Sequence, residues 1–262
     1  MSDYQNIRLE SADRIATITI DRPKALNALN PDTLRELAAA IDTLAKDPTV
    51  KVVILTGGGE KAFVAGADIA EMTHMKPEEA RHFGEAGHAV MRKIERLEKP
   101  VIAAVNGFAL GGGTEIVLAC DIVLASDRAI FGQPEIKLGI IPGFGGTQRL
   151  SRKCGPTIAK ELILSGNNIT ADRALAIGLV NAVVPAAELM NEARKRAAQI
   201  AGYGALALAA AKRAIDRGLE EPHLDDALRI EVERFAHLFG SEDQQEGMKA
   251  FLEKRPAQFK DR

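Results

Sequence analysis

The 262-residue sequence has no tryptophan and only two tyrosines and two cysteines. Cys120 lies in an apolar run and Cys154 among basic residues, a pattern that does not indicate a disulfide framework and favours a reducing, cytoplasmic setting. The most apolar stretch, residues 116–125, is short and contains Asp121, so no segment is expected to span a membrane. The start of the chain also lacks the basic and apolar regions of a secretory signal.

The sequence also has no large excess of positive or negative charge. The formal net charge is -2, which gives no general attraction to nucleic acid or to an anionic membrane. The five histidines have no metal-ligand spacing, so no metal is expected. The sequence contains no G-x-S-x-G elbow, no G-x-x-x-x-G-K-[ST] loop and no clean G-x-G-x-x-G after a strand, which argues against a serine hydrolase or a nucleotide-binding protein.

Short apolar runs alternate with helical patterns, which predicts a layered α/β fold. A β-hairpin is expected at 7–21, and Asn30 followed by Pro31 is typical of a helix N-cap. From about residue 186 helical patterns dominate. We therefore expect an α/β core over residues 1–200 and a helical region over residues 201–262.

Two segments share a layout of strand, small-residue turn and acidic residue. They are Phe63-Val-Ala-Gly-Ala-Asp68 and Ala109-Leu-Gly-Gly-Gly-Thr-Glu115. The first turn of a helix has N–H groups without intrahelical partners, and small residues let a ligand approach them. The N–H groups of Ala67 and Gly112 are the best-placed donors for an oxyanion. The alternative is that the glycines only permit tight turns.

Glu115 and Glu135 are the candidate catalytic acids. Glu115 is expected in the first turn of a helix, whereas Glu135 follows a proline in an irregular stretch. Each glutamate alone could be an ordinary surface or first-turn acid. Beside an oxyanion site, two carboxyl groups in unlike environments can hold different protonation states, one acting as base and one as acid.

With these segments the sequence resembles the crotonase, or enoyl-CoA hydratase, superfamily over nearly its full length. The similarity also includes Arg22–Ala28, Lys99–Gly107 and Ile141–Arg149. It implies a spiral of ββα units, a helical C-terminal trimerisation region and a homo-hexamer built from two trimers. Hydratases of the superfamily carry a glutamate at both acid positions, as this chain does. The implied activity is syn hydration of a trans-2-enoyl-CoA to a 3-hydroxyacyl-CoA in fatty-acid or related metabolism, without a cofactor because coenzyme A is part of the substrate.

The resemblance also implies which residues bind coenzyme A. In relatives the coenzyme is contacted by main chain near the turn that matches residues 65–69 and by residues that match 24–26. Gly143 matches a glycine that opens the next helix and approaches the catalytic pocket. Two C-terminal residues match positions that touch the coenzyme, often from a neighbouring subunit. At Thr114 many relatives have cysteine instead. The implied binding residues are Lys24, Ala25, Leu26, Ala65, Gly66, Asp68, Ile69, Gly143, Phe251 and Lys254.

Several alternatives remain open at this point. Another crotonase reaction, such as a double-bond shift or hydration of a methylglutaconyl-type thioester, would use the same fold, and some relatives bind RNA or serve as scaffolds. The acyl pocket is expected along residues 72–92. Whether the side chains there close a short pocket or flank an open tunnel depends on their packing, and short to medium acyl chains are expected. The apolar stripe from Leu224 to Leu238 could pack on the chain's own core instead of on another subunit.

Overall fold

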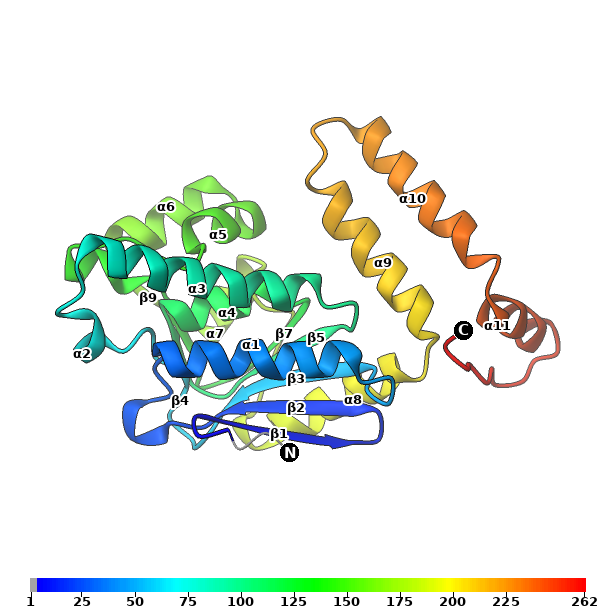
Figure 1. Ribbon diagram of the computed structural model, residues 1–262, viewed down its shortest axis with the longest axis horizontal. Coiled ribbons are helices and arrows are strands. Elements are labelled where there is room, and N and C mark those ends of the chain that lie inside the picture. The colour runs from blue at the N-terminus through cyan, green and yellow to red at the C-terminus, as the bar shows by residue number, and fades with distance from the viewer. Residues whose placement is uncertain (1–3) are drawn as a thin grey trace.

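Two β-sheets of unequal size carry the fold, and the strands of the middle of the chain alternate between them (Figure 1). The computed structural model describes residues 4–262. The larger sheet has the order β1-β2-β3-β5-β7-β10 and the smaller one β4-β6-β8-β9. The larger sheet consists of β1 (Ile7–Ala12), β2 (Ile15–Ile20), β3 (Val52–Gly57), β5 (Val101–Val105), β7 (Ile122–Ser126) and β10 (Ala182–Val184). The smaller sheet consists of β4 (Ala62–Val64), β6 (Phe108–Leu110), β8 (Ile130–Gly132) and β9 (Asn168–Thr170).

The predicted hairpin is present, with a tighter turn than the sequence suggested. Strands β1 and β2 pair antiparallel from Ile7↔Ile20 to Ala12↔Ile15. Only Asp13 and Arg14 form the turn, and both have positive φ, 51° and 66°. A two-residue turn with two positive φ angles matches the twist of the flanking strands. The first strand therefore continues to Ala12, through part of the three-residue turn expected at 11–13, and the second begins at Ile15.

The chain winds as a spiral of repeated strand pairs, which confirms the predicted fold class. Strands β3, β5 and β7 are parallel neighbours in the larger sheet. The strands that follow them, β4, β6 and β8, are parallel neighbours in the smaller sheet. The carboxyl ends of parallel strands meet at one edge of a sheet, where α/β proteins place ligands. The loops after β4, β6 and β8 therefore lie at a common edge.

Helices cover both faces of the larger sheet. Asn30 caps α1 as predicted, since its side-chain Oδ1 accepts the Thr33 N–H at 2.9 Å. On the other face α8 packs its alanine-rich side, including Ala193 and Ala197, against Ile54 of β3. The helices of the core are α1 (Pro31–Lys46), α2 (Ile69–Met72), α3 (Pro77–Arg96), α4 (Gly112–Ala119), α5 (Gly146–Cys154), α6 (Pro156–Ser165), α7 (Ala171–Ala176) and α8 (Leu189–Ala201), with short 3₁₀ helices η1 (Pro23–Ala25), η2 (Pro134–Leu138) and η3 (Ala186–Glu188).

After α8 the chain leaves the body of the molecule. Helices α9 (Ala205–Gly218) and α10 (Leu224–Leu238) form an antiparallel pair that projects from the core, and α11 (Glu242–Leu252) follows at its end (Figure 1). The apolar stripe of α10 is exposed: Leu224 is 72% accessible, Val232 62% and Phe235 62%. The alternative that the stripe packs on the chain's own core is therefore wrong.

Buried ion pairs fasten this arm to the core. Lys212 of α9 places its Nζ 2.7 Å from Oδ2 of Asp121, next to the start of β7. Lys51 is almost fully buried beside β3, and its Nζ lies 2.6 Å from Oδ1 of Asp261. A buried charge that loses its partner is strongly destabilising, so both pairs hold the ends of the arm in register with the sheet.

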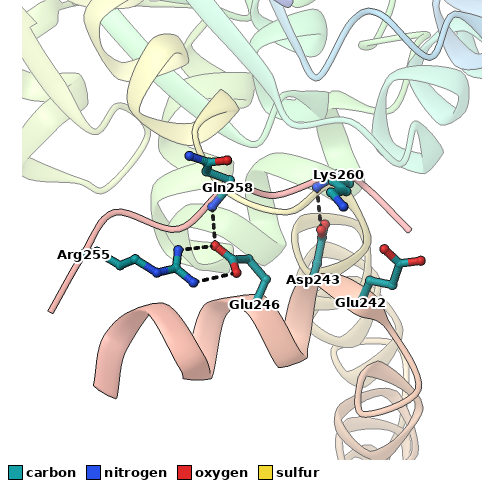
Figure 2. Close-up of a pocket in the computed structure, with 6 residues that line it drawn as sticks. All are labelled: Glu242, Asp243, Glu246, Arg255, Gln258 and Lys260. Carbon is teal, nitrogen blue, oxygen red and sulfur yellow. Dashed lines mark hydrogen bonds and ion pairs between the residues drawn. The ribbon is translucent and has the colours of Figure 1, made fainter. Parts of the chain in front are cut away.

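The last residues fold back along α11. Figure 2 shows Glu246 accepting a bidentate pair of hydrogen bonds from Arg255, at 2.6 and 2.9 Å, and a third from the Gln258 N–H. Asp243 accepts the Lys260 N–H at 2.6 Å. The residues that form these bonds line a pocket, and none of the predicted site residues is among them. Within residues 4–262 no helix combines the length and the apolar character needed to cross a bilayer.

Candidate functional site

The edge of the smaller sheet brings three loops together. The residues after β4, β6 and β8 are the Ala65–Asp68 turn, the Gly111–Gly113 turn and the segment ending in Glu135. Gly111 shows how closely they approach: a Cβ at this position would lie 2.8 Å from Oε1 of Glu135 and 3.7 Å from Cα of Gly66. The parallel register of the three strands thus assembles two distant glycine turns and one of the candidate acids.

The two turns are alike up to the candidate donor but differ after it. Gly112 is the first residue of α4, as predicted. Ala67 is not in the first turn of a helix, because α2 begins only at Ile69, after its N-cap. A glycine with positive φ precedes each candidate donor: Gly66, at 104°, comes before Ala67, and Gly111, at 50°, before Gly112. Neighbouring groups are paired, since the Leu29 N–H bonds to the Gly66 carbonyl at 2.8 Å. In the part of the chain that the structure describes, the N–H groups of Ala67 and Gly112 have no acceptor. Both are free to donate to a ligand oxygen.

Glu115 is a buried carboxylate in the first turn of α4, where the sequence placed it, and it is 1% exposed. Its hydrogen bonds come from the turn that leads into α5, not from α4. Oε1 accepts the Phe144 N–H at 2.8 Å and the Gly146 N–H at 2.7 Å. Burial raises the pKa of Glu115, while these N–H groups and the charge of Arg149 oppose that rise.

Glu135 is half-buried in η2 and meets a different environment. Burial, together with the smaller effect of the Glu115 charge, raises the pKa of Glu135 to about 7, although a hydrogen bond from its own backbone N–H opposes the shift. The side-chain amide of Gln133 lies beside Glu135. In the amide orientation that gives both its oxygen and its nitrogen hydrogen-bond partners, the nitrogen donates to the two carboxylate oxygens of Glu135, at 2.9 and 3.1 Å. Because the charge of Glu115 opposes ionisation of Glu135, the two carboxyl groups titrate as a coupled pair.

The two segments expected to bind coenzyme A lie side by side. The Leu26 carbonyl accepts the Ala65 N–H at 3.1 Å, so Lys24, Ala25 and Leu26 adjoin the turn that contains Gly66 and leads to Ile69. Asp68 pairs with Arg22, whose Nη2 is 3.1 Å from its Oδ2. Leu26 and Ile69 are 38% and 47% exposed, which leaves an open rim next to the Ala67 N–H.

The remaining predicted binding residues have less direct placements. Gly143 does not open the next helix, because α5 begins only at Gly146. It lies in the loop just before Phe144, where a Cβ would meet nothing within 4 Å. Phe251 and Lys254, at the end of α11, are not brought to this edge within the chain (Figure 1). Phe251 is 82% exposed.

Sequence reasoning missed the residues that hold the two glutamates. Gln133, Phe144, Gly146 and Arg149 contact or surround them. A signal was present, since the glycine-rich turn at 142–146 leads into a helix as the other two turns do, and helix N-termini bind anions. Among the residues described, no group of three His, Cys, Asp or Glu side chains could hold a metal ion.

Comparisons with known proteins find similar sequences and structures over nearly the whole chain. The model of one family, enoyl-CoA hydratase/isomerase, matches residues 10–262. A short-chain-enoyl-CoA hydratase of Clostridium acetobutylicum is 54% identical over 99% of this chain and 100% of its own. A crotonyl-CoA hydratase of Syntrophomonas wolfei is 52% identical over 98% of both chains. The crystal structure of an enoyl-CoA hydratase from Bacillus anthracis superposes with a TM-score of 0.95 at 42% identity, covering 98% of this chain and 100% of that one.

Two glycines of α3 provide a test of how Phe144 is held. A Cβ at Gly87 would lie 2.0 Å from the Phe144 ring, whereas one at Gly84 would meet only the Gly143 carbonyl, at 3.5 Å. We expect Gly87→Ala to lower the free energy of unfolding by about 1–3 kcal/mol through overpacking. Gly84→Ala, the matched control in the same helix, should be neutral or stabilising by up to about 1 kcal/mol. Urea denaturation measures both, and equal effects would contradict this packing.

Proposed function

Because the chain belongs to the enoyl-CoA hydratase/isomerase family, we propose that it catalyses syn addition of water to a 2-enoyl-CoA, giving a 3-hydroxyacyl-CoA. The observation that carries the proposal is the pair of acids, Glu115 and Glu135, beside two turns with free N–H groups. A double-bond shift needs one acid/base group, whereas hydration uses two. No cofactor is proposed, since coenzyme A is part of the substrate.

In the proposed mechanism the N–H groups of Ala67 and Gly112 bind the thioester oxygen. As the oxygen of water attacks C3, the Glu115 carboxylate takes its proton, and electron density moves to the thioester oxygen. Those two N–H groups stabilise the resulting enolate. Glu135 then gives its proton to C2, which completes the addition. The two glutamates have exchanged their protonation states, and the pair still holds one proton.

The environments of the two acids support these roles. The N–H groups of Phe144 and Gly146 both bind Oε1 of Glu115, which favours its ionised form and leaves Oε2 for the water. Glu135 has a pKa of about 7, so a large fraction is protonated near neutral pH. A carboxylic acid with a raised pKa is suited to deliver a proton.

Substrate size is part of the proposal. The rings of Phe83 and Phe144 form an edge-to-face pair, with centroids 5.1 Å apart. Phe144 also borders Gly112, where a Cβ would be 3.3 Å from the ring. This pair fills space beside the proposed oxyanion donor and supports a short acyl pocket. The names of the Clostridium and Syntrophomonas relatives point to short-chain substrates in those proteins.

The acyl-CoA assay tests the function directly. We expect kcat/KM to be highest at the short end of a series from four to sixteen acyl carbons. Glu115→Gln and Glu135→Gln should each lower turnover of crotonyl-CoA by at least about 100-fold, a usual loss for an acid or base positioned in the transition state. Their affinity for the thioester should change little. Near-normal turnover in either variant, or much faster use of a 3-enoyl-CoA, would contradict the assignment.

The shared proton predicts a bell-shaped pH dependence. Activity requires one proton on the glutamate pair, so kcat/KM should fall as pH rises through about 7, where the raised pKa of Glu135 releases it. It should also fall in acid, where Glu115 is protonated. The pH profiles of kcat/KM for hydration and for dehydration should have the same acid limb and the same alkaline limb, because both directions require one proton on the glutamate pair. Initial rates in the two directions measure this, and opposite limbs would refute the shared proton.

We also propose that residues 201–262 are an assembly region, through which the chain forms trimers that pair into a homo-hexamer. The exposed apolar side chains of α10 and α11 support this, since a surface of this kind needs a partner. In that assembly Phe251 and Lys254 would reach coenzyme A bound by a neighbouring subunit, where Lys254 could meet a phosphate. A reducing, cytoplasmic location is part of the proposal, supported by two free cysteines.

A substitution on α10 tests the assembly more cleanly than removal of the arm, because truncation would also leave Lys51 without Asp261. Val232→Glu should shift the chain from a hexamer to smaller species in light scattering and weaken its affinity for coenzyme A. Leu175→Glu, at a 43% exposed site on α7, is the matched control and should leave the mass unchanged. A Val232→Glu protein that remains a hexamer would rule out this interface.

A further inference from the structure

Arg149 of α5 bonds to two other elements from a nearly buried position. Its Nε and Nη2 bond to the two carboxylate oxygens of Glu95 on α3, at 2.5 and 2.9 Å. Its Nη1 donates to the Phe144 carbonyl at 2.7 Å. The guanidinium side chain is 15% exposed, and its geometry is the planar fork that binds a carboxylate with two parallel bonds.

These contacts fix the peptide groups on both sides of Phe144. The N–H of Phe144 binds Glu115, and the carbonyl of the same residue binds Arg149. The next residue, Gly145, has a φ of 108°, and a Cβ there would lie 2.0 Å from Nη1 of Arg149. The guanidinium therefore occupies the space beside residues 144–146. The N–H groups of this turn donate to Oε1 of Glu115.

We propose that Arg149, anchored by Glu95, is a positioning residue for Glu115. It fixes the 144–146 turn so that both N–H groups meet Oε1, and it places a positive charge behind the carboxylate that takes the proton from water. This inference rests on the proposed hydration. Neither residue touches the substrate in this arrangement, since Arg149 acts through Phe144 and through its charge.

The charge of Arg149 acts in the expected direction. It is one of the influences that lower the pKa of Glu115 against the effect of burial. Other ionisable groups face this region: His88, Arg92 and Glu95 from α3, and Glu135 from η2. The pKa of His88 is lowered by burial and then by Arg149 and Arg92. A His88→Asn background therefore separates titration of this imidazole from that of Glu115.

The test compares Arg149→Met, Arg149→Lys and Glu95→Gln with Arg152→Met, which removes a charge from an exposed site of the same helix. We expect Arg149→Met to lower kcat about 10- to 100-fold, as misplacement of a reacting group does, with KM changed by less than about threefold. The acid limb of its kcat/KM profile should move to higher pH, because loss of the positive charge raises the pKa of Glu115.

The other variants separate charge from geometry. Arg149→Lys keeps the positive charge but loses the planar guanidinium and its two parallel bonds to Glu95. Glu95→Gln keeps the arginine but weakens the interaction that anchors it. Both should lower kcat while the acid limb does not move upward. Arg152→Met should have the same kcat and the same acid limb as the parent protein. Infrared difference spectra, with the Glu115→Gln protein identifying the carboxyl band, report the same pKa change without turnover.

The outcomes also separate this inference from the proposed function. A parent protein that does not hydrate crotonyl-CoA would refute the function, while the infrared titration would still test the effect of Arg149 on Glu115. An active parent whose Arg149→Met variant keeps its acid limb and its carboxyl pKa would overturn the positioning role. A loss of thermal stability with an unchanged profile would show that Arg149 only joins α3 to α5.

Discussion

A carboxylate buried in the core constrains the structure around it. Glu115 is almost inaccessible to water, and burial of a charge is costly unless hydrogen bonds and an opposite charge compensate. Two N–H groups of the turn that leads into α5 and the guanidinium of Arg149 supply that compensation. The placement of α5, the conformation of Gly145 and the space that Gly87 leaves for Phe144 can all be understood as requirements of this one carboxylate.

The smaller sheet solves the problem of bringing separated segments together. Its strands β4, β6 and β8 are each only three residues long, yet they are parallel neighbours, so their ends deliver three loops to one edge. Thr114 secures two of these loops to each other, because its hydroxyl lies 2.6 Å from the Ala109 carbonyl and 3.0 Å from that of Gly132. The segment before Glu135 is thereby tied to the turn that contains Glu115.

The chain divides its apolar surface between two tasks. Most of it forms the core between the sheet and helices such as α1, where a buried leucine contributes about 1.5–3 kcal/mol relative to an exposed one. The arm of α9, α10 and α11 leaves its large side chains exposed and is held to the core by ion pairs from Lys51 and Lys212. The exposed apolar side chains of this arm are the observation that supports the proposed assembly of several copies.

The sequence by itself determined the features that depend on nearby residues. The N-cap at Asn30, the hairpin, the alternation of strands and helices, and the two similar glycine turns all follow from local propensity and spacing. It also pointed to both glutamates as candidate acids. Only the tertiary structure decided what surrounds them: the donors to Glu115 are 29 and 31 residues away, and Arg149 finds Glu95 at a separation of 54. Such contacts come from the register of parallel strands and from the packing of α4 against both α3 and α5, which no local pattern encodes. The exposed stripe of α10 was undecided for the same reason, because an amphipathic helix has the same sequence pattern whether its partner is its own core or another chain.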